Sequence, residues 1–249
     1  MLTFVVPLKS PLASGNWRLV SALANRCLKS LASQTDPGYR ILLVCNEPPD
    51  NLERHANLTV LTLSLPTPGN AQEGMFDKWR KVREGLIHAR EFAPCFVMVV
   101  DADDCVSRRL AAFVNRRPTA HGWFVETGYC HDEGTRWVFC RAEFHRLCGT
   151  SSIVLCHKHD LPDPAAPKSG CLLLDYGHSR IVDHMEKEGR PLEPLPFPAV
   201  VYITGTGENH SGYALGPLRS RKPYFAKLLG CRPLLGMLRR QFNLYPIVV

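Results

Sequence analysis

Three carboxylates follow a run of four apolar residues in the first half of this sequence. Residues 97–100 are Val-Met-Val-Val, and Asp101, Asp103 and Asp104 come directly after them. Carboxylates this close repel one another, so their charge must be offset by a bound cation or by solvent at the start of a helix. Hard cations such as Mg²⁺ and Mn²⁺ bind one or two carboxylates together with phosphate oxygens. The triplet indicates either a metal and phosphate site or a helix cap, with Asp103 or Asp104 preceding a helix near Ser107.

Other potential metal ligands lie between residues 130 and 159, where cysteines and histidines are interleaved. Thiolates and imidazoles are the usual ligands of zinc. None of the ten cysteines is spaced as CxxC, so buried small residues and loop histidines are favoured over a zinc site. The residues concerned are Cys130, His131, Cys140, Cys148, Cys156, His157 and His159.

The elements that would position the triplet alternate between strands and helices. Continuous apolar runs predict buried strands, and apolar residues repeated every three or four positions predict helices. This alternation predicts an α/β fold with a mostly parallel sheet and helices on both faces. The predicted strands span residues 2–7, 40–47, 58–65 and 95–100. One predicted helix follows a cap at Asn16, and a second spans residues 75–92.

The predicted sheet also indicates where a ligand would bind. Ligands of parallel sheets bind beyond the carboxyl ends of the strands, which is where Asp101 lies. If the chain stays extended from Asp101 to Asp103, the two side chains point into the same crevice.

Composition and charge limit the possible classes of protein. The chain has 249 residues, of which 45% are apolar and 21% charged, so it is a globular protein and global disorder is excluded. The net charge of +7 suits an anionic ligand, an anionic membrane surface or a nucleic acid. No run approaches the roughly 20 apolar residues of a membrane span, and no secretory leader is recognised. We therefore expect a cytoplasmic protein.

Much of the positive charge lies near the C-terminus. Seven Lys or Arg and no acidic residue occur between Arg219 and Arg240. They alternate with apolar side chains from Gly216 to Phe242, which predicts docking on an anionic membrane, at the inner face of the cell membrane. The alternative is a C-terminal helix packed on the protein with its basic residues in water. A nucleic-acid partner is not expected, because few aromatic residues are interleaved with the basic ones.

The order of the motifs resembles a known family. A strand ends in Val-Val-Pro at residues 5–7, and a helix ends in Cys-Leu-Lys-Ser-Leu-Ala-Ser-Gln-Thr at residues 27–35. A second helix carries Gly-Leu-Ile-His-Ala-Arg at residues 85–90, and an apolar strand leads into Asp-Ala-Asp-Asp at residues 101–104. Together these features resemble family 2 glycosyltransferases of the GT-A fold. The resemblance covers residues 2–115 well and residues 120–212 more loosely.

The resemblance implies a nucleotide-diphosphate sugar as donor, a UDP-sugar first of all, and Mn²⁺ or Mg²⁺ as cofactor. It implies that Asp103 binds the metal with Asp101 and His210, and that Asp101 also faces the nucleotide. Asn46 and Glu47 depart from the family, in which many members have an aspartate followed by Gly-Ser. Lys78 and Arg83 could reach the diphosphate or could lie on a solvated helix face. The implied nucleotide-binding residues are Pro7, Lys9, Asn46, Glu47, Lys78, Arg83, Asp101 and Ala102.

The resemblance also implies a general base for the acceptor hydroxyl, as inverting members require. The base would stand at the start of a helix that runs to Glu188, where His178 and Asp175 are the candidates. A histidine with a pKa of about 6.5 can serve as a base. The alternative is that either residue caps the helix.

The expected function is an inverting, metal-dependent glycosyltransferase that acts on a carbohydrate or lipid-linked acceptor. Residues 1–115 would bind the nucleotide sugar, residues 116–215 the acceptor, and residues 216–249 would form the basic tail. A nucleotidyltransferase would use a similar metal site, but residues 8–15 contain a single Lys and lack the expected Gly-rich basic loop. A non-catalytic nucleotide-binding scaffold is the remaining alternative.

Overall fold

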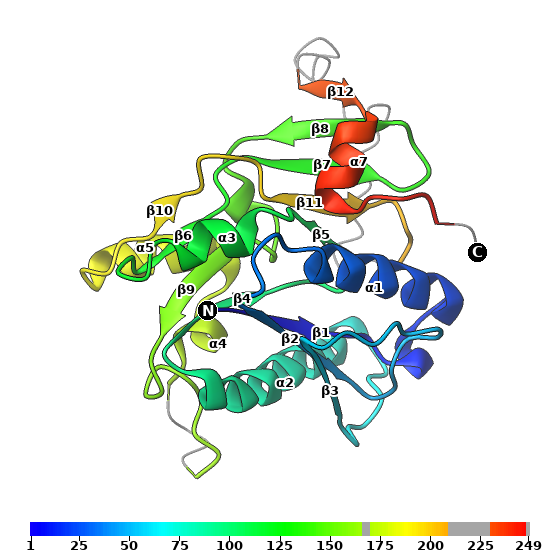
Figure 1. Cartoon of the computed structure of the whole chain (residues 1–249). Helices are drawn as coiled ribbons and strands as arrows, with labels where there is room; N and C mark the ends of the chain where they lie inside the picture. Colours follow the sequence, from blue (N-terminus) through cyan, green and yellow to red (C-terminus); the bar gives the residue numbers. More distant parts are fainter. Residues whose placement is uncertain (166–169, 209–229, 248–249) are drawn as a thin grey trace.

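A seven-stranded sheet forms the centre of the molecule in the computed structural model, which describes residues 1–165, 170–208 and 230–247 (Figure 1). The strand order is β10-β6-β9-β4-β1-β2-β3. Every neighbouring pair is parallel except the two that involve β9. The α/β fold with a mostly parallel central sheet is therefore confirmed. The strands are β1 (Leu2–Pro7), β2 (Tyr39–Cys45), β3 (Leu58–Thr62), β4 (Cys95–Val99), β6 (Gly122–Phe124), β9 (Ser152–Cys156) and β10 (Glu193–Pro194).

Two long helices cover opposite faces of the parallel strands (Figure 1). Helix α1 (Trp17–Ala32) starts at Asn16, whose side chain accepts a hydrogen bond from the backbone N–H of Leu19, as the sequence predicts. Helix α2 (Ala71–Ala89) starts four residues earlier than predicted, because Asn70 caps it through the N–H of Glu73. All six residues of β1 are buried, as expected for a strand between two helical layers.

A glycine allows α2 to lie close to the sheet. A Cβ atom at Gly85 would stand 2.5 Å from Cγ1 of Val5, so only a glycine fits between the helix and β1. This close approach places the first half of α2 beside the carboxyl end of β1, next to Leu8.

A second, five-stranded sheet has the order β12-β8-β7-β11-β5. It begins directly after the acidic triplet, since β5 is Cys105–Val106, and it pairs β5 with β11 in antiparallel fashion. Its other strands are β7 (Gly128–Asp132), β8 (Trp137–Arg141), β11 (Val200–Thr204) and β12 (Cys231–Pro233). The other helical elements in the described parts of the chain are α3 (Leu110–Asn115), α4 (Leu172–Asp175), α5 (His178–Lys187), α7 (Gly236–Phe242) and short 3₁₀ turns at Pro11–Ala13, Arg90–Phe92 and Phe144–Arg146.

The described part of the predicted tail is joined to this second sheet. Strand β12 pairs with β8, and Phe242 at the end of α7 is 1% exposed and meets the ring of Tyr129 at 5.8 Å. The N–H of Arg108 donates to the backbone carbonyl of Gln241. Residues 230–247 therefore pack on the protein, while residues 216–229 of the predicted tail lie outside the described residues.

None of the helices in the described ranges is both long enough and apolar enough to cross a bilayer.

Candidate functional site

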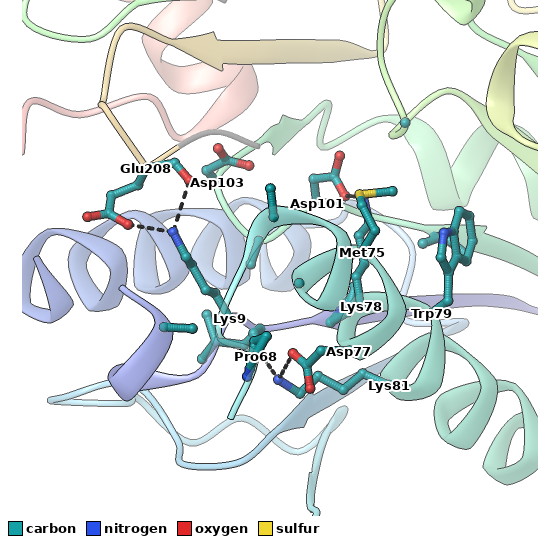
Figure 2. Close-up of a pocket in the computed structure, with 18 of the residues that line it drawn as sticks. Lys9, Pro68, Met75, Asp77, Lys78, Trp79, Lys81, Asp101, Asp103 and Glu208 are labelled. Carbon is teal, nitrogen blue, oxygen red and sulfur yellow. Dashed lines mark hydrogen bonds and ion pairs between the residues drawn. The ribbon is translucent and has the colours of Figure 1, made fainter. Parts of the chain in front are cut away.

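A cavity of about 970 Å³ lies at the carboxyl ends of β1 and β4 (Figure 2). One wall is the N-terminal half of α2, from Ala71 to Lys81, and another is the start of α5. The segments after the two strands contribute Lys9, Asp101 and Asp103. The position agrees with the rule that ligands of such sheets bind beyond the carboxyl ends of the strands. The volume is at the upper end of the range that small-molecule sites occupy.

The triplet reaches the cavity through a turn. The N–H of Asp104 donates to the backbone carbonyl of Asp101 at 3.0 Å, so the chain is not extended as the sequence analysis assumed. Asp101 and Asp103 nevertheless both line the cavity. The N–H of Asp101 donates to Oγ1 of Thr150, and a Cβ at Gly149 would stand 2.9 Å from the carboxylate of Asp101. The loop before β9 therefore holds Asp101 closely from behind.

Asp104 is fully buried and has a structural role. Its carboxylate accepts hydrogen bonds from Oγ1 of Thr150 at 2.6 Å, from the N–H of Ile203 at 3.1 Å and from Sγ of Cys148 at 3.3 Å. Burial, together with the charges of its neighbouring aspartates, raises the pKa of Asp104 well above its usual value. The predicted alternative of a helix cap is wrong, because β5 follows the triplet and α3 begins only at Leu110.

The charge of the triplet is only partly neutralised. Lys78 on α2 forms an ion pair with Oδ1 of Asp101. Burial lowers the pKa of Lys78, but attraction to the three aspartates outweighs this effect and the pKa is raised. Burial and the charge of Asp101 raise the pKa of Asp103 to about 7. Excess negative charge of this kind favours a cation at the cavity wall.

Two further lysine–carboxylate pairs border the same cavity (Figure 2). Lys9 Nζ donates to Oε2 of Glu208 at 2.7 Å, and the other oxygen of Glu208 accepts from the N–H of Asn16 at 2.7 Å. Lys81 Nζ donates to Oδ2 of Asp77 at 2.6 Å and to the backbone carbonyl of Leu8 at 2.8 Å.

Three members of these pairs were not predicted from the sequence, namely Asp77, Lys81 and Glu208. The spacing of Asp77 and Lys81, four residues apart on a predicted helix, was a usable signal for an ion pair. Their burial was not visible in the sequence, because both have charged side chains. Among the described residues, Oδ1 of Asp77 is buried and has no hydrogen-bond partner. An acceptor left in this way is costly, so the group is of interest as part of the cavity wall.

Seven of the predicted site residues line the cavity. They come from the ends of β1 and β4, from α2 and from the start of α5, which are far apart in the sequence. The structure thus brings together Pro7, Lys9, Lys78, Asp101, Ala102, Asp103 and His178.

Four predicted residues are not among those that line it. Asn46 donates to the backbone carbonyl of Leu65, and Glu47 is exposed beyond β2. Arg83 points to Glu84, with 3.1 Å between its Nη1 and Oε1 of Glu84. Asp175 accepts from the N–H of Cys171 at 2.7 Å and so closes its own helical turn. The fifth case, His210, lies outside the described residues.

His178 is the first residue of α5, at the position where the sequence analysis expects a helix to begin. It is partly buried, and burial together with the charge of Lys78 lowers its pKa, against the opposite influence of Asp101. A histidine with a lowered pKa is mostly neutral at pH 7 and can accept a proton.

The residues present fit a divalent cation. Asp101 and Asp103 supply hard carboxylate oxygens at the cavity wall, which is the protein contribution that Mg²⁺ and Mn²⁺ usually take. Within the described ranges no cluster of three or more His, Cys, Asp or Glu is arranged to hold a metal. The remaining ligands would therefore come from phosphate oxygens and water, as they do in many nucleotide enzymes.

No protein-family model matches the sequence, and no curated protein matches it. Among solved structures, S. aureus TarS aligns with a TM-score of 0.39 and 12% identity over 91% of this chain and 41% of the TarS chain. A structure of S. aureus TarS 1-349 aligns with a TM-score of 0.42 and 14% identity over 97% of this chain and 72% of that one. The present chain thus spans less than half of the longer TarS chain.

A third solved structure with some similarity is Francisella tularensis 2-C-methyl-D-erythritol 4-phosphate cytidylyltransferase. It aligns with a TM-score of 0.39 and 12% identity over 82% of this chain and 90% of that chain. Similarity at this level does not identify a reaction.

Proposed function

We propose that the protein is a glycosyltransferase that uses a nucleotide-diphosphate sugar, a UDP-sugar first of all, with the assistance of Mn²⁺ or Mg²⁺. The observation that carries the proposal is the joint position of Asp101, Asp103, Lys78 and Lys9 at one cavity beyond the parallel strands. Two carboxylates for a cation and two lysines for phosphate oxygens are the groups that a nucleoside diphosphate requires. The ordered motifs that resemble family 2 glycosyltransferases support the same assignment.

The leaving group of such a reaction is a nucleoside diphosphate, whose developing charge must be neutralised. A divalent cation supplies this as a Lewis acid when bound. Asp101 and Asp103 would hold the cation, while Lys78 and Lys9 would attract the phosphate oxygens. Pro7, at the end of β1, would lie against the nucleotide.

His178 is the proposed general base. It lines the same cavity as α2, and its lowered pKa keeps the imidazole neutral at pH 7. It would take the proton of the acceptor hydroxyl, which then attacks the anomeric carbon from the side opposite the diphosphate and inverts the configuration. Tyr176 and Ile181 border the cavity beside His178, so this side is the proposed place of a carbohydrate or lipid-linked acceptor.

The test is a thermal-shift screen of nucleotide sugars, nucleoside diphosphates and nucleoside triphosphates, with and without Mn²⁺. We expect a UDP-sugar to raise the melting temperature only when Mn²⁺ is present. Positive hits are then incubated with short-chain alcohol and sugar acceptors, and release of UDP is measured. If no nucleotide stabilises the protein under any condition, the proposal fails. If only triphosphates stabilise it, the nucleotidyltransferase alternative replaces it.

A further inference from the structure

Each of the three lysines at the cavity is already paired with a carboxylate, and the three pairs differ in what surrounds them. The pair of Lys81 and Asp77 is buried, and Lys81 donates a second hydrogen bond to the carbonyl of Leu8. Glu208 binds Lys9 and also the backbone of Asn16, which fixes it in place.

The pair of Lys78 and Asp101 is different. Its side chains are 29% and 25% exposed, and its carboxylate belongs to the proposed metal site. The backbone N–H of Asp101 is held from behind by Thr150, whereas, within the described residues, the Lys78 ammonium forms its ion pair with Asp101 alone. The lysine can therefore leave its partner by rotating about its side-chain bonds, while the carboxylate stays in place.

This arrangement makes Lys78 a competitor of a metal ion. A divalent cation that approaches Asp101 meets an ammonium group already bound there, and the two positive charges repel. A nucleoside diphosphate that approaches without a metal meets the carboxylates of Asp101 and Asp103, and like charges repel again. When both arrive together, the metal can replace the ammonium at Asp101, and the ammonium can bind a phosphate oxygen.

We propose that Lys78 couples metal binding to diphosphate binding by exchanging its partner, from Asp101 in the empty site to the diphosphate in the loaded site. The inference rests on the proposed function and adds a mechanism to it. Lys78 acts as an internal counter-ion, which keeps the site from binding a divalent cation before the nucleotide arrives. Because binding couplings are reciprocal, it also keeps the nucleotide from binding tightly without the metal.

Lys78 competes with the metal ion for Asp101. Its removal should therefore tighten metal binding but weaken nucleotide binding. In Lys78→Met, we expect the affinity for Mn²⁺ alone to rise by roughly 5- to 10-fold, the lower range of typical coupling factors. The affinity for UDP in saturating Mn²⁺ should fall by a similar factor, since one phosphate contact is lost. Free Mn²⁺ is counted by electron paramagnetic resonance, and UDP binding is measured by isothermal titration calorimetry.

Two controls separate charge from packing. Lys78→Arg keeps a cation beside Asp101 and should bind Mn²⁺ alone as weakly as the wild type does. Arg80→Met removes the same charge from an exposed position on the same helix, two residues away and not among the residues that line the cavity. It should change neither affinity by more than about twofold, as expected of an exposed charge that solvent and salt screen. Lys78→Gln repeats the test should the Met variant fold poorly.

The outcomes separate this inference from the proposed function. If the wild type binds UDP with Mn²⁺ but Lys78→Met binds Mn²⁺ alone no more tightly, the exchange is wrong and the proposed function stands. Equal tightening in Lys78→Met and Lys78→Arg would also overturn it, because the effect would not come from charge. If the wild type binds no UDP even in saturating Mn²⁺, both proposals fall.

Discussion

Two ion pairs whose lysines lie on helix α2 differ in burial, and this difference separates a structural pair from a pair at the candidate site. Lys81 and Asp77 lie one turn apart on α2 and are both buried, and Lys81 also donates to the carbonyl of Leu8, just after β1. Lys78 lies between them in the sequence but pairs with Asp101, just after β4, and both partners remain partly exposed. The chemistry of the two pairs is the same. The first fixes the helix to the sheet, whereas the second can change partners.

The largest effect is expected when a carboxylate beside the partly exposed pair is removed. Asp103→Ala should abolish Mn²⁺-dependent nucleotide binding, because it removes a metal ligand. Stability should hold or rise slightly, since the pKa of about 7 shows that the folded protein disfavours the charged carboxylate. Calorimetry with UDP and Mn²⁺, and urea unfolding at pH 8, measure the two effects. Unchanged nucleotide affinity would show that the triplet does not bind the metal.

The opposite pattern is expected on the closed side. Lys81→Met leaves the carboxylate of Asp77 buried without its cation, and breaking a buried pair typically costs about 3–5 kcal/mol of unfolding free energy. The double variant Lys81→Met, Asp77→Leu should recover much of the loss, because no charge is left unpaired. By contrast, Lys78→Met should cost less than about 1 kcal/mol, as exposed pairs do. Urea unfolding of the three variants decides whether the two pairs differ as described.

His178 lines the same cavity and is the proposed general base. His178→Ala should lower turnover by roughly 10²- to 10⁴-fold, the usual contribution of a general base, while UDP binding stays intact. Because the pKa of His178 is lowered, activity of the wild type should rise with pH through an inflection below 6.5 and then stay level. Asp175→Ala is the matched control, and it should keep both the rate and the pH profile. Loss of activity in the control alone would make Asp175 the base.

The smallest effect is expected at the C-terminal region, far from both pairs in the sequence. We propose, as the sequence suggests, that residues 216–242 dock on an anionic membrane, with about 1 kcal/mol from each Lys or Arg that comes near the surface. Co-sedimentation should recover more protein with phosphatidylserine vesicles than with phosphatidylcholine vesicles. Charge reversal at Arg232 and Arg240, both exposed, should reduce the difference without disturbing the buried Phe242. Equal recovery with both vesicles would contradict the proposal.

The first half of the fold was predictable because its signals are local. The strand at residues 2–7 and the cap at Asn16 were placed correctly, since a continuous apolar run and a capping side chain are readable in a short window. The start of α2 was missed by four residues, because its first turn is polar and contains Gly74. The second sheet was not predicted, because its strands are short and three of its four pairings join segments far apart in the sequence, with β7 and β8 the exception.

The candidate site was predictable in its location but not in its pairing. The rule about strand ends placed Asp101 and Asp103 at a cavity, although the backbone there is a turn and not the extended chain assumed. Asn46, Glu47, Arg83 and Asp175 are polar residues in loops or on helices, and their local periodicity does not show which way they point. The partner of Lys9, Glu208, is set by tertiary packing and has no local signal, whereas the spacing of Asp77 and Lys81 on one helix could suggest that pair.

The hydrogen bonds of Asp104 determine how one backbone amide exchanges its hydrogen with solvent. One of its carboxylate oxygens accepts the N–H of Ile203 on β11, and the other accepts from Thr150 and Cys148 beside β9. A single side chain thus joins the two sheets immediately behind the cavity. The backbone amide of Ile203 can exchange its hydrogen with water only when this joint opens. The rate of hydrogen exchange at Ile203 therefore reports how often the contacts behind the cavity open, and it can be measured without a substrate.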